Sequence, residues 1–404
     1  MKIAGLFGVL LSMVAATALV EPTHAVSWWD VQSVDTMKYS RDLSREKLND
    51  SSFDAVIAQQ MKDIAATGAT HVAIATPYDE EFFPLLKRWV AAARKEGLHV
   101  WFRGNWSGWE GWFNYPRITR AEHTAKTKQF LSAHSDIFED GDIFSACPEC
   151  ENGGPGDPRT TGDIAGYRSF ITSEYAMTKA AFHSMGKDVA SNWQSMNADV
   201  ARVVMDPATT QAMDGLVVID HYVKDPKQIA ADISSIAAAS GGKVALGEFG
   251  APIPDIHGKF TEKQQADWLS AVFQGLLRSP SIVGVSYWVS VGGSTQLWND
   301  DLSPRAAVDV LRSYYSPSYV TGKVTGAWGR GVSGARVLSL EDKVVTTDKQ
   351  GMFALPYTRK SIEVEVSALG YTTVTQVIQA GGTAPIHIKL EKRGFFYSIQ
   401  QFFC

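Results

Sequence analysis

The chain has few of the residues on which small disulfide-bonded proteins and nucleic-acid-binding proteins depend. Its only cysteines in 404 residues are Cys147, Cys150 and Cys404, so no framework of disulfides holds the fold together. The formal net charge is -5 and no basic run interrupts the sequence, which excludes an electrostatic surface for nucleic acid. We therefore expect a fold that depends on a large hydrophobic core, and no nucleic-acid partner.

Long apolar runs are also scarce, with one exception at the start of the sequence. Met1 and Lys2 precede an apolar run that ends near Val20, and a short polar stretch then leads to Ala25. One positive residue, a short apolar segment and a small residue are typical of a secretory signal peptide rather than a membrane span. We predict a signal peptide over 1–25 and a secreted, periplasmic or cell-surface protein.

Short apolar runs alternate with longer amphipathic segments through residues 26–317. Residues such as Phe53, Ile57 and Met61 recur at helical spacing between the runs. Continuous apolar strands joined by helices indicate a parallel sheet covered on its outer face, and eight such units close as a (β/α)8 TIM barrel. The predicted strands are 26–32, 70–76, 99–105, 142–149, 188–193, 215–222, 243–250 and 282–289.

An open, doubly wound α/β sheet is the alternative to the barrel. No glycine-rich phosphate loop follows the first predicted strand, so we favour the barrel. Two helix starts can also be predicted. Thr261 and Gln264 have the spacing of a capping box, and Ser303-Pro304 would place proline at the first position of the last helix.

The pattern changes after residue 317. Residues 321–391 consist of short strand-like stretches with turns and have no helical period, which predicts a small all-β sandwich. The stretches VTGKVTG, SGARV, TTDKQGMFALP and VSALGY resemble the carboxypeptidase regulatory-like domain, which implies spacing, anchoring or weak binding. The aromatic tail over 392–404 is expected to pack on the sandwich, with surface association or a disulfide-linked dimer as alternatives.

Polar residues stand where the predicted barrel strands end, which is where active sites lie in this fold. Two strands bring carboxylates to one face, and a pair of carboxylates is what glycoside hydrolysis needs. A solvated loop is the other explanation for the acidic residues of the fourth strand. The residues at these strand ends are Arg103, Asn105, Trp106, Glu149, Glu151, Asn192, Trp193, Asp220, His221, Tyr222, Glu248 and Trp288.

The order of these motifs carries a resemblance. The seventh strand contains GEFG, the eighth ends in SYWV, the sixth contains DHYV, and the fourth ends in a glutamate. Together they resemble clan A of the glycoside hydrolases, most of all family five, over residues 26–317. The resemblance implies a retaining enzyme with Glu248 as the nucleophile and Glu149 as the acid/base. It further implies that Arg103 orients Glu248, that His221 and Tyr222 form the sixth-strand pair, and that Trp288 lies under the sugar.

One position departs from that family, which usually has asparagine directly before the acid/base. Here this position is Pro148. Either Asn152 or Asn192 then binds the sugar 2-hydroxyl, or Glu151 is the acid/base. Asn105 and several tryptophans complete the candidate binding residues, each tryptophan having core packing as its alternative role: Trp106, Trp109, Trp112, Trp193 and Trp288.

Cys147 and Cys150 have the spacing that begins a zinc site, but the second pair of ligands is missing. We expect a disulfide or two free thiols, and neither a metal nor a cofactor. The predicted function is hydrolysis of a β-linked glucan, mannan or related oligosaccharide by two glutamates. A carbohydrate-binding or adhesion protein and a transglycosylase are the alternatives. The expected partner is a carbohydrate, and attachment to the cell surface through the C-terminal domain or tail is left open.

Overall fold

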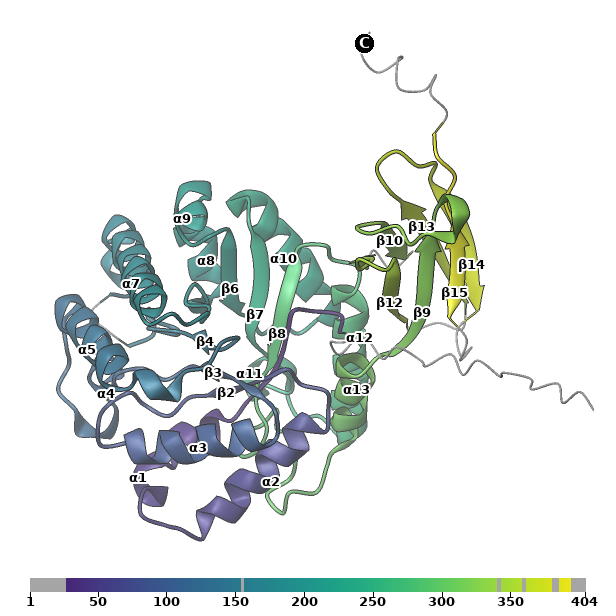
Figure 1. The fold of residues 1–404 in the computed structure, drawn as a ribbon. Helices are drawn as coiled ribbons and strands as arrows, with labels where there is room; N and C mark the ends of the chain where they lie inside the picture. Colours follow the sequence, from purple (N-terminus) through teal and green to yellow (C-terminus); the bar gives the residue numbers. More distant parts are fainter. Residues whose placement is uncertain (1–26, 154–155, 340–342, 358–360, 380–384, 394–404) are drawn as a thin grey trace, which may run out of the picture.

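The structure is a computed structural model that describes residues 27–153, 156–339, 343–357, 361–379 and 385–393. The predicted signal peptide, the tail from residue 394 and Cys404 lie outside the described residues. Figure 1 shows a larger lobe of strands surrounded by helices and a smaller lobe built of strands. Each lobe has its own cluster of buried hydrophobic side chains.

Eight parallel strands form the larger lobe, in the order β4-β3-β2-β1-β8-β7-β6-β5. A parallel bridge between Ile143 and Ala190 joins the two ends of this order, and the Phe144 amide donates to the Ala190 carbonyl at 2.9 Å. The ring therefore closes, and the predicted (β/α)8 barrel is confirmed. The strands are β1 (Val31–Asp35), β2 (His71–Ile74), β3 (His99–Phe102), β4 (Ile143–Phe144), β5 (Ser195–Asn197), β6 (Leu216–Asp220), β7 (Lys243–Phe249) and β8 (Ile282–Tyr287).

Helices cover the outside of the barrel (Figure 1). All helices of this lobe, including short ones in the connections, are α1 (Ser44–Lys47), α2 (Phe53–Ala65), α3 (Phe83–Lys95), α4 (Ser107–Glu110), α5 (Arg120–Ala133), α6 (Pro158–Thr161), α7 (Ile164–Ser184), α8 (Ala198–Val204), α9 (Pro207–Ala212), α10 (Pro226–Ser240), α11 (Pro254–His257), α12 (Glu262–Leu276) and α13 (Ala306–Tyr315). Short single turns lie at η1 (Lys38–Asp42), η2 (Trp112–Asn114) and η3 (Ser135–Ile137).

The helical periodicity predicted from sequence is borne out in α2, where Phe53, Ile57 and Met61 are all buried. The capping box of Thr261 and Gln264 is present at the start of α12. The predicted start of the last helix is wrong, because Pro304 bridges Trp298 instead and α13 begins at Ala306.

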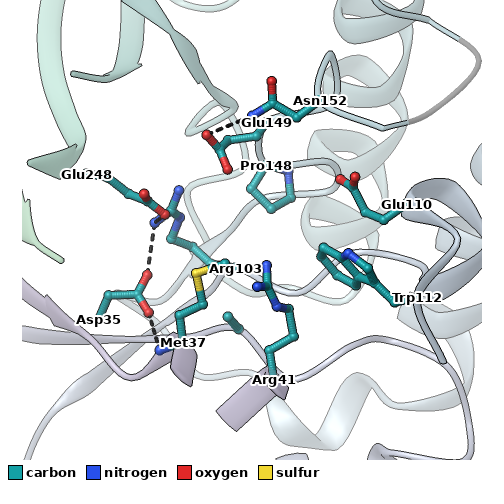
Figure 2. Close-up of a pocket in the computed structure, with 11 residues that line it drawn as sticks. Asp35, Met37, Arg41, Arg103, Glu110, Trp112, Pro148, Glu149, Asn152 and Glu248 are labelled. Carbon is teal, nitrogen blue, oxygen red and sulfur yellow. Dashed lines mark hydrogen bonds and ion pairs between the residues drawn. The ribbon is translucent and has the colours of Figure 1, made fainter. Parts of the chain in front are cut away.

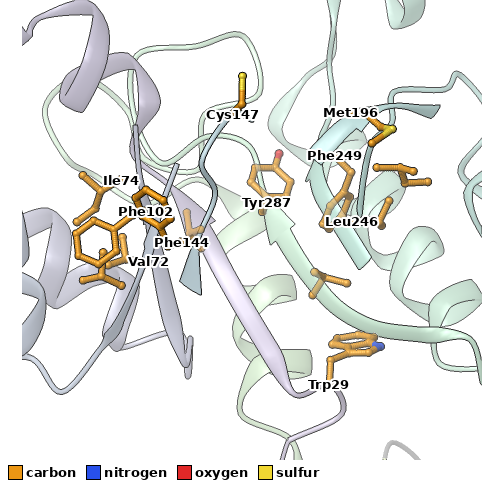
Figure 3. Close-up of a cluster of buried hydrophobic side chains, with 14 of the residues drawn as sticks. Trp29, Val72, Ile74, Phe102, Phe144, Cys147, Met196, Leu246, Phe249 and Tyr287 are labelled. Atoms are coloured by element: carbon orange, nitrogen blue, oxygen red, sulfur yellow. The ribbon is translucent and has the colours of Figure 1, made fainter. Parts of the chain in front are cut away.

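Alternate residues of the strands face two different hydrophobic clusters. One set, which includes Val72, Ile74, Phe102 and Phe144 (Figure 3), packs in the same cluster as helix residues such as Trp89. The other set fills the inside of the barrel and consists of Val31, Ala73, Trp101, Ile143, Trp193, Leu216, Val218 and Ala245. Trp101 and Trp193 pack edge to face here, with ring centroids 5.0 Å apart. Branched aliphatic residues occupy this interior in most barrels of this kind.

Two predicted strands are displaced. The first was expected at 26–32, but Trp28 and Trp29 are buried outside the ladder and β1 pairs with β8 only from Val31 onward. The fifth was expected at 188–193. Of residues 188–193, only Ala190 forms a bridge with β4, whereas pairing with β6 begins at Ser195. The chain from 188 to 197 therefore pairs with β4 near its start and with β6 near its end.

The smaller lobe has two sheets, of order β11-β10-β13-β14 and β12-β9-β15. Inward residues alternate with exposed ones, as with Ile362, Val364 and Val366 of β13, so this lobe is the predicted all-β sandwich. The strands are β9 (Ser318–Thr325), β10 (Arg336–Ser339), β11 (Val344–Thr346), β12 (Met352–Tyr357), β13 (Ser361–Ser367), β14 (Val374–Gln379) and β15 (Ile386–Lys389), with a single turn η4 (Ala327–Gly329). Among the described residues, no helix combines the length and apolar character needed to cross a bilayer.

Candidate active site

A pocket of about 220 Å³ lies at the C-terminal ends of the barrel strands (Figure 2). Its side chains come from the ends of β1, β2, β3 and β7 and from the segments that follow β1, β3 and β4. The pocket is highly charged, since four carboxyl groups and two guanidinium groups face it. The lining residues are Asp35, Met37, Arg41, Ala75, Arg103, Glu110, Trp112, Pro148, Glu149, Asn152 and Glu248.

Arg103 is the charged centre of this site. It follows β3 and is buried, and its Nη1 donates to Asp35 Oδ2 at 2.9 Å and to Glu248 Oε1 at 2.8 Å. Its Nη2 donates to Asp220 Oδ2 at 3.0 Å and to Ser195 Oγ at 2.9 Å. One guanidinium therefore links the ends of β1, β6 and β7 and the start of β5. Because its planar fork presents several donors in fixed directions, Arg103 sets the orientation of all these groups.

Glu248 lies near the end of β7 and accepts hydrogen bonds at both carboxylate oxygens. Arg103 binds Oε1, and the hydroxyl of Tyr222 donates to Oε2 at 2.7 Å. Trp288, at the end of β8, packs edge to face on Tyr222 with ring centroids 6.1 Å apart and remains partly exposed. Glu248 is thus held in one orientation, with its charge stabilised by donors, as a carboxylate nucleophile requires.

Glu149 lies in the tight loop after β4. Its backbone is in the left-handed region, with φ of 47°, and its amide donates to the Ser195 carbonyl at 2.8 Å. Cys147 and Cys150 on either side of it form a disulfide, which was one of the two expected states of this pair. The side chain of Glu149 accepts a hydrogen bond from Asn152 Nδ2 at 3.0 Å.

Glu149 and Glu248 face each other across the pocket (Figure 2). One carboxylate oxygen from each of Glu149, Asp220 and Glu248 lies within 4.8 Å of the other two. Burial raises the pKa of Glu149 well above its ordinary value of 4.5, and the negative charge of Glu248 raises it further. Glu149 is therefore suited to hold a proton opposite Glu248, as the acid/base of a carboxyl pair must.

Asp35 and Asp220 complete the acidic cluster around Arg103. Burial raises the pKa of Asp35 to about 6 and that of Asp220 well above its ordinary value, although Arg103 opposes both changes. The three carboxyl groups nearest one another, Glu149, Asp220 and Glu248, could in principle bind a cation. However, the guanidinium of Arg103 already bonds to Asp220 and Glu248, so positive charge is supplied by the chain itself.

A second wall of the pocket is formed by Arg41, Glu110 and Trp112 (Figure 2). The guanidinium carbon of Arg41 lies 4.4 Å from the ring centroid of Trp112, within the range of a cation–π contact. Glu110 Oε1 accepts a hydrogen bond from Asn105 Nδ2 at 3.2 Å, and burial raises the pKa of Glu110 to about 7. This wall adds donors, acceptors and one flat aromatic face to the site.

The structure brings seven of the predicted site residues together: Arg103, Trp112, Glu149, Asn152, Tyr222, Glu248 and Trp288. Glu151 is not among them. It is fully buried, accepts hydrogen bonds from the amide and side chain of Asn197 and from Tyr167, and does not line the pocket. Its carboxyl group holds the loop in place, so the alternative that made Glu151 the acid/base is not supported by the geometry.

Five other predicted contact residues turn away from the pocket. Asn105 is buried and supports Glu110 rather than a ligand. The Asn192 side chain bonds the Met213 carbonyl, and His221 bonds Asp232 of α10. Trp106 and Trp193 are buried core side chains, and so is Trp109.

Sequence reasoning missed Asp35, Arg41 and Glu110 as site residues, and it placed Asp220 at a strand end without giving it a role. Asp35 was not recognised as a strand-end residue, because the first strand was predicted to end at residue 32 and β1 ends at Asp35. Asp220 directly precedes His221 and Tyr222, so its strand-end position was the available signal. Arg41 lies in η1 and Glu110 at the end of α4, and elements of four or five residues are too short for a period in the sequence to indicate the direction of a side chain.

Comparison with known sequences identifies the smaller lobe. Residues 319–391 match the carboxypeptidase regulatory-like domain, which confirms the expectation drawn from the strand motifs. No curated protein is significantly similar in sequence to this chain.

Solved structures share the fold of the larger lobe. A GH5_18 protein from Bifidobacterium longum subsp. longum, in complex with Manb1-4GlcNAc, superposes with a TM-score of 0.52 at 13% identity, over 76% of this chain and 86% of its own. A GH5_18 from Bifidobacterium longum subsp. infantis gives 0.52 at 12% identity, over 76% and 87%. An FMN-binding beta-glucuronidase from Facaelibacterium prausnitzii gives 0.51 at 10% identity over 90% of this chain, which spans 57% of that protein. The chain therefore has the barrel fold that the resemblance to glycoside hydrolases implied.

Proposed function

We propose that this protein is a retaining β-glycoside hydrolase. The observation that carries the proposal is the approach of carboxylate oxygens of Glu149 and Glu248 to within 4.8 Å across one pocket. Retaining enzymes hold their two carboxyl groups about 5–5.5 Å apart, whereas inverting enzymes leave about 6.5–9.5 Å for a water molecule. The fold shared with GH5_18 structures is consistent with this assignment.

The roles follow from the surroundings of the two groups. Glu248, fixed by Arg103 and Tyr222, attacks the anomeric carbon. Glu149, whose pKa is raised by burial and by the charge of Glu248, protonates the departing glycosidic oxygen. Glu149 then takes a proton from water, which releases the sugar from Glu248 with retained configuration. Trp288 and Trp112 offer aromatic faces to the sugar ring.

We propose a β-linked glucan, mannan or related oligosaccharide as the substrate, and residues 26–317 as the catalytic domain. Residues 321–391 would then act as a spacing or anchoring domain. We also propose export by cleavage of 1–25, which mass spectrometry of the mature N-terminus would test. A mature chain that keeps residues 1–25 would contradict export.

The decisive experiment is turnover of aryl β-glycosides and of β-glucan and β-mannan oligosaccharides, with Manb1-4GlcNAc included. Wild type should be active, while Glu149→Ala and Glu248→Ala should each lose most of the rate. Azide should restore turnover in both variants, with a β-glycosyl azide from Glu149→Ala and an α-glycosyl azide from Glu248→Ala. A wild type that binds these sugars without turning over any of them would favour the carbohydrate-binding alternative. Products longer than the substrate would identify a transglycosylase.

A further inference from the structure

The loop that carries Glu149 is closed on itself by a disulfide. Cys147 and Cys150 are bonded through sulfur, with Cα atoms 5.1 Å apart, so only Pro148 and Glu149 lie between them. Both cysteines are buried, with exposed fractions of 3% and 1%. Such a small ring strongly limits the backbone conformations of the two enclosed residues. Pro148 adds a restraint, because its own ring fixes φ.

Glu149 needs that restraint. Its φ of 47° lies in the left-handed region, which residues other than glycine rarely adopt unless the surrounding structure imposes it. Relaxation to an ordinary extended or helical conformation would redirect the bond from Cα to Cβ. The carboxyl group of Glu149 would then no longer point across the pocket.

Three hydrogen bonds also connect the backbone of the disulfide ring to the rest of the barrel domain. The Cys147 amide donates to Gln194 Oε1 at 3.1 Å, and Trp109 Nε1 donates to the Cys150 carbonyl at 2.8 Å. Between them, the Glu149 amide donates to the Ser195 carbonyl at 2.8 Å. The Glu149 side chain, by contrast, accepts one described hydrogen bond, from the exposed Asn152. The direction of the carboxyl group is therefore set mainly by the backbone of the ring.

We propose that the Cys147–Cys150 disulfide is a positioning element for the acid/base. It holds the backbone of Glu149 in the left-handed conformation that aims the carboxyl group at Glu248. The inference rests on the proposed function, since Glu149 has a proton to transfer only if the chain is a glycosidase.

The test compares wild type with the Cys147→Ser/Cys150→Ser double variant on two aryl β-glycosides. With the basic leaving group phenolate, whose departure needs a proton, the variant should lose about 10- to 100-fold in kcat/KM. With the good leaving group 2,4-dinitrophenolate, kcat/KM should change less than about 3-fold, because that group departs without general acid catalysis. Azide should accelerate steady-state turnover of the variant on the second substrate and leave wild type unchanged. A purely structural defect would lower both rates together and would not respond to azide.

A double-mutant cycle assigns the effect to Glu149. In a Glu149→Ala background, the two serine substitutions should cost less than about 2-fold, because the group they position is already absent. Cys404→Ser is the matched control, since it removes a cysteine and leaves the ring intact. Equal losses in the two backgrounds would contradict the proposal.

Unchanged kcat/KM in the double-serine variant would overturn the positioning role of the disulfide and leave the proposed glycosidase function intact. An inactive wild type would contradict both the positioning role and the glycosidase function. If the double variant does not fold, wild-type protein refolded with a phosphine reductant is measured in the same way. If the reduced chain does not fold either, the ring is needed for folding itself, and that result also contradicts a positioning role.

Discussion

Replacement of Arg103 by methionine should be the most damaging single change in the barrel. The substitution keeps an unbranched side chain but removes the charge that binds Asp35, Asp220 and Glu248 at 2.8–3.0 Å. All of these carboxyl groups are buried. Removal of one partner from a buried ion pair costs about 3–5 kcal/mol of stability. We expect a loss in this range near neutral pH.

The loss should depend on pH in a defined direction. A carboxyl group with a raised pKa in the folded protein binds protons more tightly there than in the unfolded chain. Stability therefore falls as pH rises from the unfolded value of about 4 through the folded value. Burial already raises the pKa of Asp35 to about 6 and that of Asp220 well above its ordinary value. Without Arg103 these pKa values should rise more, so Arg103→Met should be closer to wild type at pH 5 than at pH 8.

Urea unfolding at pH 5 and pH 8 measures both quantities. Arg278→Met serves as the control, because Arg278 is exposed on the turn after α12 and its loss removes the same charge from the surface. A deficit for Arg103→Met below about 1 kcal/mol at pH 8, or one no larger than at pH 5, would refute the reasoning from a buried charge cluster.

Three further predictions concern the pocket and the barrel interior. Because the charge of Glu248 raises the pKa of Glu149, NMR titration of Glu149 in Glu248→Gln should give a lower pKa than in wild type; an unchanged value would be inconsistent with their electrostatic coupling. Burial raises the pKa of Glu110 from 4.5 to about 7, so wild-type stability should fall between these pH values by about 1–2 kcal/mol after allowance for its partial solvent access. Glu110→Gln should lose this slope in thermal melts, and a persisting slope would assign it to other groups. Gly284→Ala should lose about 1–3 kcal/mol of stability in urea unfolding, because its Cβ would lie 2.5 Å from Trp193 Cη2. Adding Trp193→Phe should recover part of that loss. An unchanged stability in Gly284→Ala would mean that the side chains inside the barrel can move to make room for the added methyl group.

The sequence by itself determined the barrel and the sandwich, and it placed one glutamate at the end of the seventh strand and a pair of candidates, Glu149 and Glu151, after the fourth. Strand and helix periods are local properties, and hydrophobic burial enforces them wherever the segments pack. Strand ends of a parallel barrel share one face, so Glu149, Tyr222, Glu248 and Trp288 could be gathered from their order along the chain. The number of cysteines also made a zinc site at Cys147 and Cys150 improbable, because the chain has no second pair of cysteines to complete the ligands.

Only the tertiary structure decided which polar side chains face the pocket. Glu149 and Glu151 are two residues apart, yet one lines the pocket and the other is buried against Asn197. That difference arises from the turn imposed by the disulfide and from the left-handed backbone of Glu149, which have no signature in hydrophobic period. Asp35 joined the site because β1 begins later than its apolar run, a register fixed by pairing with β8. Such choices depend on contacts between residues far apart in the chain, which a local pattern does not contain.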